Sequence, residues 1–189
     1  MQIKQTSNNK FIDENNIKNT CFLIRHGECI SNKKWPIKNY TDEMDKLTKL
    51  GEKQILEKVN FFKKYKKNNF KIISSTLTRA IQSAKILNQK LIKSKILSPD
   101  ERIVEKNHEE KILSFKKRTN SFFKNRIKRN KGPYIIVAHG HLIETLLLLS
   151  IDKKYSLVTR KDKTRGIKGI WGVHNGSVSA MVENQFVFF

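Results

Sequence analysis

Short runs of apolar residues recur along the chain, each bounded by polar or turn-forming residues. Apolar runs of about four to eight residues are typical of strands that are buried on both faces of a sheet. Such runs lie at residues 21–25, 70–73 and 134–138, and a shorter candidate lies at residues 95–97. Pro99 ends this shorter candidate, because proline cannot donate a backbone hydrogen bond. We therefore expect three buried strands and one short strand.

Between these runs, apolar residues recur every three to five positions, which is the spacing of an amphipathic helix. The pattern predicts helices over residues 47–62, 80–91 and 112–127, and a fourth helix that begins in the apolar stretch 142–149. Gly132 and Pro133 end the third helix, and residues 139–141 (His-Gly-His) are expected to form a turn.

Strands that alternate with helices of this length predict an α/β fold with three layers (α/β/α) and a mostly parallel central sheet. Residues 1–19 are rich in Asn, Gln and Lys and are expected to form a flexible polar tail. We expect residues 20–189 to form a single domain, with a charged loop over residues 153–169. Alternating residues at 173–182 and 185–189 predict one or two closing strands.

Composition excludes several classes of protein. No apolar run approaches the roughly 20 residues that a membrane-spanning helix needs, and the polar first 20 residues do not resemble a secretory signal. Two cysteines, Cys21 and Cys29, cannot form a disulfide framework. We therefore expect a cytoplasmic protein that does not bind membranes.

The chain carries 39 basic and 17 acidic residues, a net charge of +22. Basic residues are densest at residues 58–71 and 116–131, where the pattern favours the solvated outer face of a helix over a nucleic-acid groove. Lys, Asn and Ile have codons rich in A and T, so nucleotide bias explains part of the charge. A positive field still attracts phosphorylated partners.

The polar residues that directly follow the predicted strands point to chemistry. Arg25 and His26 follow the first strand, Arg79 comes shortly after the second, and His139 follows the strand at residues 134–138. Open α/β sheets bind ligands beyond the carboxyl ends of their strands. We therefore expect two arginines and two histidines to meet at one edge of the sheet.

These residue types suit the transfer of a phosphoryl group. The planar guanidinium of arginine matches the oxygens of phosphate and neutralises their charge. A neutral imidazole is a competent nucleophile, and a second, protonated histidine can bind an oxygen of the transferring group and stabilise it. A carboxylic acid is then needed to protonate the leaving oxygen and afterwards to activate water. This scheme requires no metal and no cofactor.

Five sequence elements, in this order, resemble those of the histidine phosphatase superfamily in its phosphoglycerate mutase-like branch. They are LIRHGECISN (23–32), LTKLGEKQ (47–54), SSTLTRAIQSA (74–84), VAHGHLI (137–143) and NGSV (175–178). The resemblance spans nearly the whole chain and implies a phosphoglycerate mutase-like fold.

The resemblance implies a role for each matching residue. His26 would be the nucleophile that becomes phosphohistidine, and Arg25, Arg79 and His139 would form the phosphate pocket. Asn32 would be a supporting donor to the phosphate, although an asparagine at this place can also simply cap a turn.

The proton donor is less clearly marked. In the family a glutamate often follows the third strand in a pattern similar to DERIVE at residues 100–105, which nominates Glu105. Glu109 and Glu110 lie a helical turn further on and stay open as alternatives. His108 and His141 are interpreted as bystanders.

Two further readings concern the cysteines. A zinc site built from Cys21, His26, Cys29 and His139 fails because the spacing holds no paired ligand motif. Cys29 stands where the family commonly has Ser or Thr, and a small packed residue is favoured over a reactive thiol.

Departures from the family pattern bear on the activity. Glu144 stands where the family often has Arg, and Thr76 replaces its usual proline. Only 33 residues separate Glu105 from His139, whereas the mutases carry a longer insertion there. A short cap implies a more open pocket, which favours hydrolysis over mutase action.

The sequence therefore predicts a metal-independent phosphomonoester hydrolase that acts through a phosphohistidine. Its expected substrate is a phosphorylated small molecule or a phosphoprotein. A phosphoglycerate mutase-type phosphotransferase is the first alternative. The second is a basic nucleic-acid-binding or regulatory module with little turnover, which the pattern does not favour.

Overall fold

The computed structural model describes residue 12 and residues 16–65, 68–91, 94–107, 109–128, 132–144, 173–182 and 185–188. Six strands form one sheet in the order β3-β2-β4-β1-β5-β6. The strands are β1 (Cys21–Arg25), β2 (Lys71–Ser74), β3 (Lys95–Ile96), β4 (Tyr134–Ala138), β5 (Val178–Val182) and β6 (Gln185–Phe188). The first four pair in parallel, and β5 runs antiparallel to both of its neighbours. The predicted mostly parallel sheet is confirmed.

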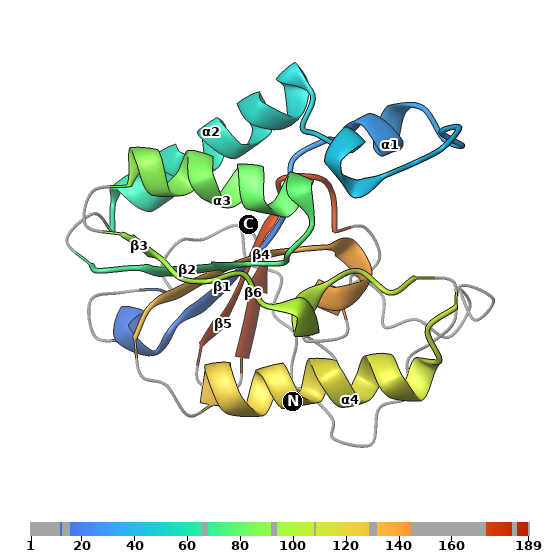
Figure 1. Ribbon diagram of the computed structural model, residues 1–189. Coiled ribbons are helices and arrows are strands. Elements are labelled where there is room, and N and C mark those ends of the chain that lie inside the picture. The colour runs from blue at the N-terminus through green and yellow to red at the C-terminus, as the bar shows by residue number, and fades with distance from the viewer. Residues whose placement is uncertain are drawn as a thin grey trace.

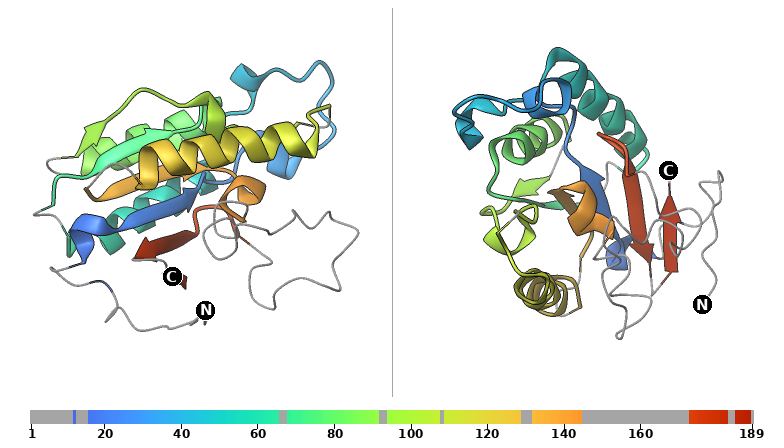
Figure 2. Two further views of the ribbon diagram at one scale, coloured as in Figure 1. Left: turned by 90° about the horizontal axis from the view of Figure 1, so that it is seen from below. Right: turned by 90° about the vertical axis from the view of Figure 1, so that its right-hand side faces the viewer.

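Helices cover both faces of this sheet, so the predicted three-layer fold is also confirmed (Figures 1 and 2). The helices α2 (Lys49–Lys63) and α3 (Thr78–Lys90) lie on one face, and α4 (Ile112–Phe122) lies on the other. A short helix α1 (Ile30–Lys33) projects beyond the sheet edge. Three turns of 3-10 helix are η2 (Ile17–Asn19), η3 (Asp42–Met44) and η4 (Glu101–Ile103).

The core consists of two layers, one on each face of the sheet. Alternate residues of the parallel strands point to opposite faces, so Phe22 packs toward α2 while its neighbour Leu23 packs toward α4. Phe62 of α2 contacts Phe22 with ring centroids 5.0 Å apart. Every residue of β4 is buried, which explains its continuous apolar run.

Three predicted boundaries are wrong. Residues 140 and 141, predicted as a turn, already belong to a helix that is described to residue 144. The α-helical part of the third helix ends at Phe122 and continues as the π-helix Phe123–Lys128 (η5), in which backbone hydrogen bonds join residues five apart rather than four. The closing strand begins at Val178 rather than at residue 173, because Gly176 adopts a positive φ of 71° in a turn before it.

Some expectations fall largely outside the described residues. These are the charged loop, the residues after 144 of the fourth helix and most of the expected tail. Within that tail, however, Ile12 and Ile17 are buried in the core. No helix in the described ranges is long and apolar enough to cross a membrane.

The start of α2 is pressed against the loop that follows β1. A Cβ atom added to Gly51 would lie 2.0 Å from the carbonyl oxygen of Glu28, and one added to Gly27 would lie 2.2 Å from the carbonyl oxygen of Gly51. Both of these short contacts would be with backbone atoms, so rotation of a side chain cannot relieve them. This contact fixes the loop after β1 relative to the helix layer.

We expect Gly51→Ala to lower the free energy of unfolding by about 1–3 kcal/mol, the usual penalty of overpacking. Alanine favours a helix by about 1 kcal/mol over glycine, so propensity alone predicts the opposite sign. Urea denaturation measures the difference. Lys53→Ala at an exposed position of α2 is the control and should change stability by less than about 0.5 kcal/mol. An unchanged or raised stability of Gly51→Ala would contradict the contact.

Candidate active site

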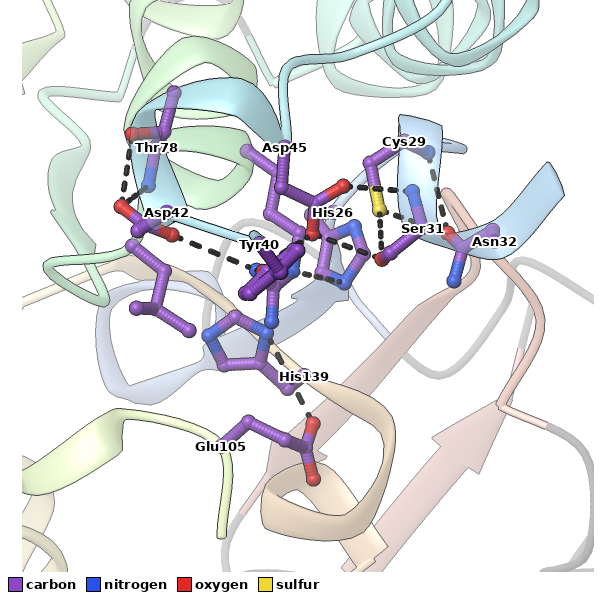
Figure 3. A network of polar contacts seen from close by, with 12 residues as sticks. His26, Cys29, Ser31, Asn32, Tyr40, Asp42, Asp45, Thr78, Glu105 and His139 are labelled. Carbon is purple, nitrogen blue, oxygen red and sulfur yellow. Dashed lines mark hydrogen bonds and ion pairs between the residues drawn. The ribbon is translucent and has the colours of Figure 1, made fainter. Parts of the chain in front are cut away.

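The carboxyl ends of β1, β2 and β4 bring residues from distant parts of the chain to one edge of the sheet (Figure 3). The backbone N–H of His26 donates to the carbonyl of Ala138, at 3.0 Å. The rings of His26 and His139 lie 5.1 Å apart, and Arg79 from the first turn of α3 contacts His26. The structure therefore brings together three of the predicted site residues, and Arg25, the last residue of β1, directly precedes His26.

The imidazole of His26 is almost fully buried and held in one orientation. Its Nδ1 lies 2.7 Å from the carbonyl oxygen of Gly27, so Nδ1 must carry the hydrogen and donate it. Nε2 then has a lone pair, which accepts a bond from Nε of Arg79 at 3.3 Å. Burial, followed by the charge of Arg79, lowers the pKa of His26 to about 3. The ring is thus neutral near pH 7, with its nucleophilic nitrogen toward the arginine.

Acidic and phenolic groups surround the guanidinium of Arg79. Its Nη1 lies 3.0 Å from Oδ2 of Asp45, 3.4 Å from the hydroxyl of Tyr40 and 3.6 Å from Oδ1 of Asp42 (Figure 3). Burial raises the pKa of Asp45, but hydrogen bonds from Ser31 and the charge of Arg79 outweigh it, so the pKa is lowered overall. A buried carboxylate therefore balances and orients this cation.

Sequence reasoning missed Tyr40, Asp42 and Asp45. Asp42 also accepts hydrogen bonds from the backbone N–H and the hydroxyl of Thr78, both at 2.8 Å. This ties the segment around η3 to the start of α3. The available signal was the position of Asp45 two residues before the LTKLGEKQ element.

The second arginine, Arg25, has a different environment. Its Nη1 donates to the carbonyl of Val173, while its buried Nε has no hydrogen-bond partner among the described residues. Burial lowers the pKa of Arg25 from that of a free guanidinium, a group that stays charged in proteins. An unused donor on a partly buried cation is suited to an anion.

His139 is fully buried at the end of β4. Its Nε2 lies 2.8 Å from the hydroxyl of Ser75, while Nδ1 has no hydrogen-bond partner in the described part of the chain and lies 3.9 Å from Oε2 of Glu105. Burial, followed by the charges of His26 and Arg79, lowers the pKa of His139 well below its usual value. This second imidazole is therefore neutral near pH 7, and the expectation that the second histidine is protonated is wrong, because burial and nearby positive charge both oppose its protonation.

The three candidate carboxylates differ in their surroundings. Glu105 lies beside His139 (Figure 3), and its other oxygen, Oε1, lies 2.9 Å from Nδ1 of His141. Glu110 is paired with Arg118 at 2.6 Å, and Glu109 is exposed. The geometry favours Glu105, and it brings His141, interpreted as a bystander, into contact with that glutamate. His108 lies outside the described residues.

Asn32 caps the short helix α1. Its Oδ1 accepts from the backbone N–H of Cys29 at 3.1 Å and from Nδ2 of Asn175 at 2.9 Å. Both bonds use Oδ1, so this oxygen acts as the cap of the turn, as the alternative interpretation of Asn32 predicts. The amide nitrogen takes no part in these two bonds. Cys29 is buried, and burial raises the pKa of its thiol, as expected for a packed residue rather than a reactive one.

The remaining motif residues hold the loop after β1 in place. Glu28 accepts a hydrogen bond from the Thr48 hydroxyl at 2.7 Å, and its backbone N–H donates to Gln54 at 2.8 Å. The backbone N–H of Gly27 donates to the hydroxyl of Ser83 at 3.2 Å. The loop that carries His26 is therefore fastened to both α2 and α3.

Two further features concern charge and metals. Burial, reinforced by the charge of Glu105, raises the pKa of Glu144, so the site has a partly buried carboxyl where the family often has a cation. Within the described ranges, no group of three or more His, Cys, Asp or Glu residues is arranged to hold a metal ion.

Comparisons with known proteins extend this description. Residues 21–105 match the family model of the histidine phosphatase superfamily (branch 1). No curated protein matches the sequence significantly.

Several solved structures share the fold. A phosphoserine phosphatase variant from Entamoeba histolytica, solved with phosphoserine, is 20% identical with a TM-score of 0.62, covering 89% of this chain and 94% of that one. Phosphoglycerate mutase from Bacillus anthracis is 17% identical with a TM-score of 0.61, covering 90% and 91%. A structure described as mycobacterial hydrolase 1 is 17% identical with a TM-score of 0.65, covering 89% and 95%.

At these identities the structural matches establish the fold, and the family model supplies the sequence relationship. The resemblance drawn from the motifs is confirmed: residues 21–105 carry the sequence pattern of the histidine phosphatase superfamily, branch 1, and the described chain has the phosphoglycerate mutase-like fold.

Proposed function

We propose that this protein is a metal-independent phosphomonoester hydrolase that acts through a phosphohistidine on His26. The observation that carries the proposal is the orientation of that imidazole. Its Nδ1–H is committed to the carbonyl of Gly27, so Nε2 is the nitrogen with a lone pair, and it lies among cationic groups. A neutral nucleophile beside two guanidinium groups suits attack on an anionic ester.

The donors around His26 supply a binding site for the phosphoryl oxygens. Arg25 offers its buried Nε, and His139 offers Nδ1 if the Ser75 hydroxyl donates to Nε2 and so fixes that tautomer. Arg79 binds phosphate by exchanging its long contact with His26, at 3.3 Å, for a charged oxygen. This exchange frees the lone pair of Nε2 when the substrate binds.

The reaction proceeds in two steps. Nε2 of His26 attacks phosphorus, the P–N bond forms and the P–O bond to the leaving group breaks, while Glu105 donates a proton to the leaving oxygen. In the second step the ionised Glu105 takes a proton from water, whose oxygen attacks phosphorus. The P–N bond breaks, inorganic phosphate leaves, and both residues return to their starting states.

The proposed substrate is a phosphorylated small molecule or a phosphoprotein, in the cytoplasm. The Entamoeba neighbour was solved with phosphoserine and also with 3-phosphoglyceric acid, both small phosphate monoesters that carry a carboxylate. The net charge of +22 favours anionic substrates in general.

Mutase-type transfer is the second candidate, because a phosphoglycerate mutase is among the structural neighbours. The short segment between Glu105 and His139 favours hydrolysis. Incubation with 3-phosphoglycerate distinguishes the two: a hydrolase releases phosphate, whereas a mutase forms 2-phosphoglycerate and depends on a bisphosphate primer.

We expect the purified protein to hydrolyse an aryl phosphate in the presence of a chelator. His26→Ala should lower kcat/KM by more than about 10³, because removal of a nucleophile leaves only binding and electrostatic stabilisation. Acid-sensitive, base-stable labelling of the wild type by radioactive phosphate would identify the phosphohistidine. A need for added metal, or equal activity in His26→Ala, would contradict the proposal, and salt-sensitive nucleic-acid binding without turnover would support the basic-module alternative.

The neutrality of His26 also predicts a pH-dependent stability. The unfolded chain binds a proton with the ordinary pKa of about 6.5, whereas the folded chain resists protonation until about pH 3. The contribution of His26 to stability should therefore fall as the pH is lowered from 7, by about 2 kcal/mol at pH 5, and His139 adds a loss of the same sign. Between pH 7 and pH 5, the free energy of unfolding of His26→Gln should fall by about 2 kcal/mol less than that of the wild type. Denaturation at both pH values measures this difference. His174→Gln, which replaces an exposed imidazole, is the control and should follow the wild type.

Glu105→Gln tests the proton donor. Poor leaving groups need protonation and activated aryl oxides do not, so kcat/KM should fall about 10²-fold or more for alkyl phosphates and far less for 4-nitrophenyl phosphate. Glu109→Gln and Glu110→Gln are the matched controls. A leaving-group effect in either control but not in Glu105→Gln would assign the acid role to that control residue.

A further inference from the structure

The contact between His141 and Glu105 lies outside the sequence prediction and outside the two-step scheme. His141 belongs to the helix that follows His139, and its side chain is 60% exposed. Its Nδ1 lies 2.9 Å from Oε1 of Glu105. Because His141 contacts the proposed proton donor, it influences the orientation of the Glu105 carboxyl group.

The backbone before Glu105 is already fixed by a different residue. Nη1 of Arg118, from α4, donates to the carbonyls of Arg102 at 2.8 Å and Val104 at 2.7 Å. The guanidinium of Arg118 is held in turn by its ion pair with Glu110. The remaining freedom of Glu105 therefore lies in its side chain, which is long and rotates about several bonds.

His141 and His139 contact different oxygens of the Glu105 carboxyl group. Nδ1 of the exposed His141 lies 2.9 Å from Oε1. Oε2 lies 3.9 Å from Nδ1 of the buried His139 (Figure 3). A carboxyl group that accepts a hydrogen bond at one oxygen carries its acid proton on the other. With Nδ1–H of His141 donating to Oε1, the transferable proton is on Oε2.

We infer that His141 is a positioning residue for the proton donor, holding Oε1 of Glu105 so that Oε2 faces the leaving group. The inference rests on the proposed function, because it assigns Glu105 the role of acid and base. His141 neither gives nor takes a proton: the proton on Oε2 moves to the leaving oxygen, and a proton from water later restores it. Its contribution is to remove side-chain orientations of Glu105 that point away from the substrate.

The test compares kcat/KM across a series of aryl and alkyl phosphates, because this constant reports the steps up to cleavage of the ester bond. His141→Ala should lower kcat/KM about tenfold for the poorest leaving groups, a part of the roughly 10²–10⁴ that a general acid contributes. For the most activated ester the change should stay within about twofold. Such a dependence on leaving group separates positioning of the acid from general damage to the site.

His141→Asn is the conservative variant, because the amide nitrogen of asparagine occupies nearly the place of histidine Nδ1 and can donate to the same oxygen. It should restore kcat/KM for poor leaving groups to within about threefold of the wild type. An equal loss in His141→Ala and His141→Asn would overturn the hydrogen-bonding role, as would a loss that is the same for all leaving groups. Since His141 is largely exposed, both variants are expected to fold, which urea denaturation checks.

The same substrates, assayed with the wild type, His26→Ala, Glu105→Gln and His141→Ala, distinguish a failure of this inference from a failure of the proposed function. If the wild type lacks activity that depends on His26, the proposed function fails. If the wild type is active and Glu105→Gln shows the leaving-group effect but His141→Ala does not, the positioning role alone fails.

Discussion

The chemistry of this site depends on keeping one imidazole uncharged between two arginines. Burial and the nearby guanidinium group of Arg79 both oppose protonation of His26, and a backbone carbonyl fixes the tautomer through Nδ1. A protonated ring would have no lone pair, and a ring of the other tautomer would aim a hydrogen at the substrate. The buried carboxylate of Asp45 completes this balance, because it is the nearer of the two carboxylates, with Asp42, that offset the buried positive charge of Arg79.

Much of the sequence signature serves this imidazole without touching a substrate. The close approach of Gly27 and Gly51 permits the loop after β1 to lie on the start of α2, and Glu28, Gln54 and Ser83 tie it down by hydrogen bonds. A nucleophile on a loop gains in this way the precision of one on a helix or strand.

Local patterns predict those parts of the molecule that local forces determine. The apolar runs at residues 21–25 and 134–138 predict both ends of β1 and β4 correctly. Strands that are buried on both faces are apolar at nearly every position, so the run has the length of the strand. The convergence of Arg25, His26 and His139 at the ends of these two strands followed from the rule for parallel sheets.

Contacts made between distant segments left no periodic signal. Asp42 and Asp45 lie in a polar stretch whose pattern suggests only a loop, and their role appears when that loop folds over the start of α3. The contact of His141 with Glu105 joins residues 36 positions apart, so no local pattern distinguishes His141 from a bystander. The start of its helix at residue 140 was missed as well, since glycine disfavours helices in the absence of tertiary packing.

The distribution of acidic residues connects the surface charge with the site. In a chain of net charge +22, carboxylates are scarce, yet Asp42, Asp45, Glu105 and Glu144 all contact or electrostatically influence site residues, and Glu28 helps to hold the loop after β1. The excess of lysine and arginine attracts any anion over about a Debye length, roughly 8 Å at physiological ionic strength, and does not discriminate among anions. Discrimination has to arise inside the site, where each carboxylate has a defined partner: Asp45 orients Arg79, Glu28 fixes the nucleophile loop, and Glu105 faces His139. In the proposed hydrolase, an anion that does not replace the contact of Arg79 with His26 gains only the long-range attraction, so the proposed preference for a phosphoryl group rests on the contacts inside the site.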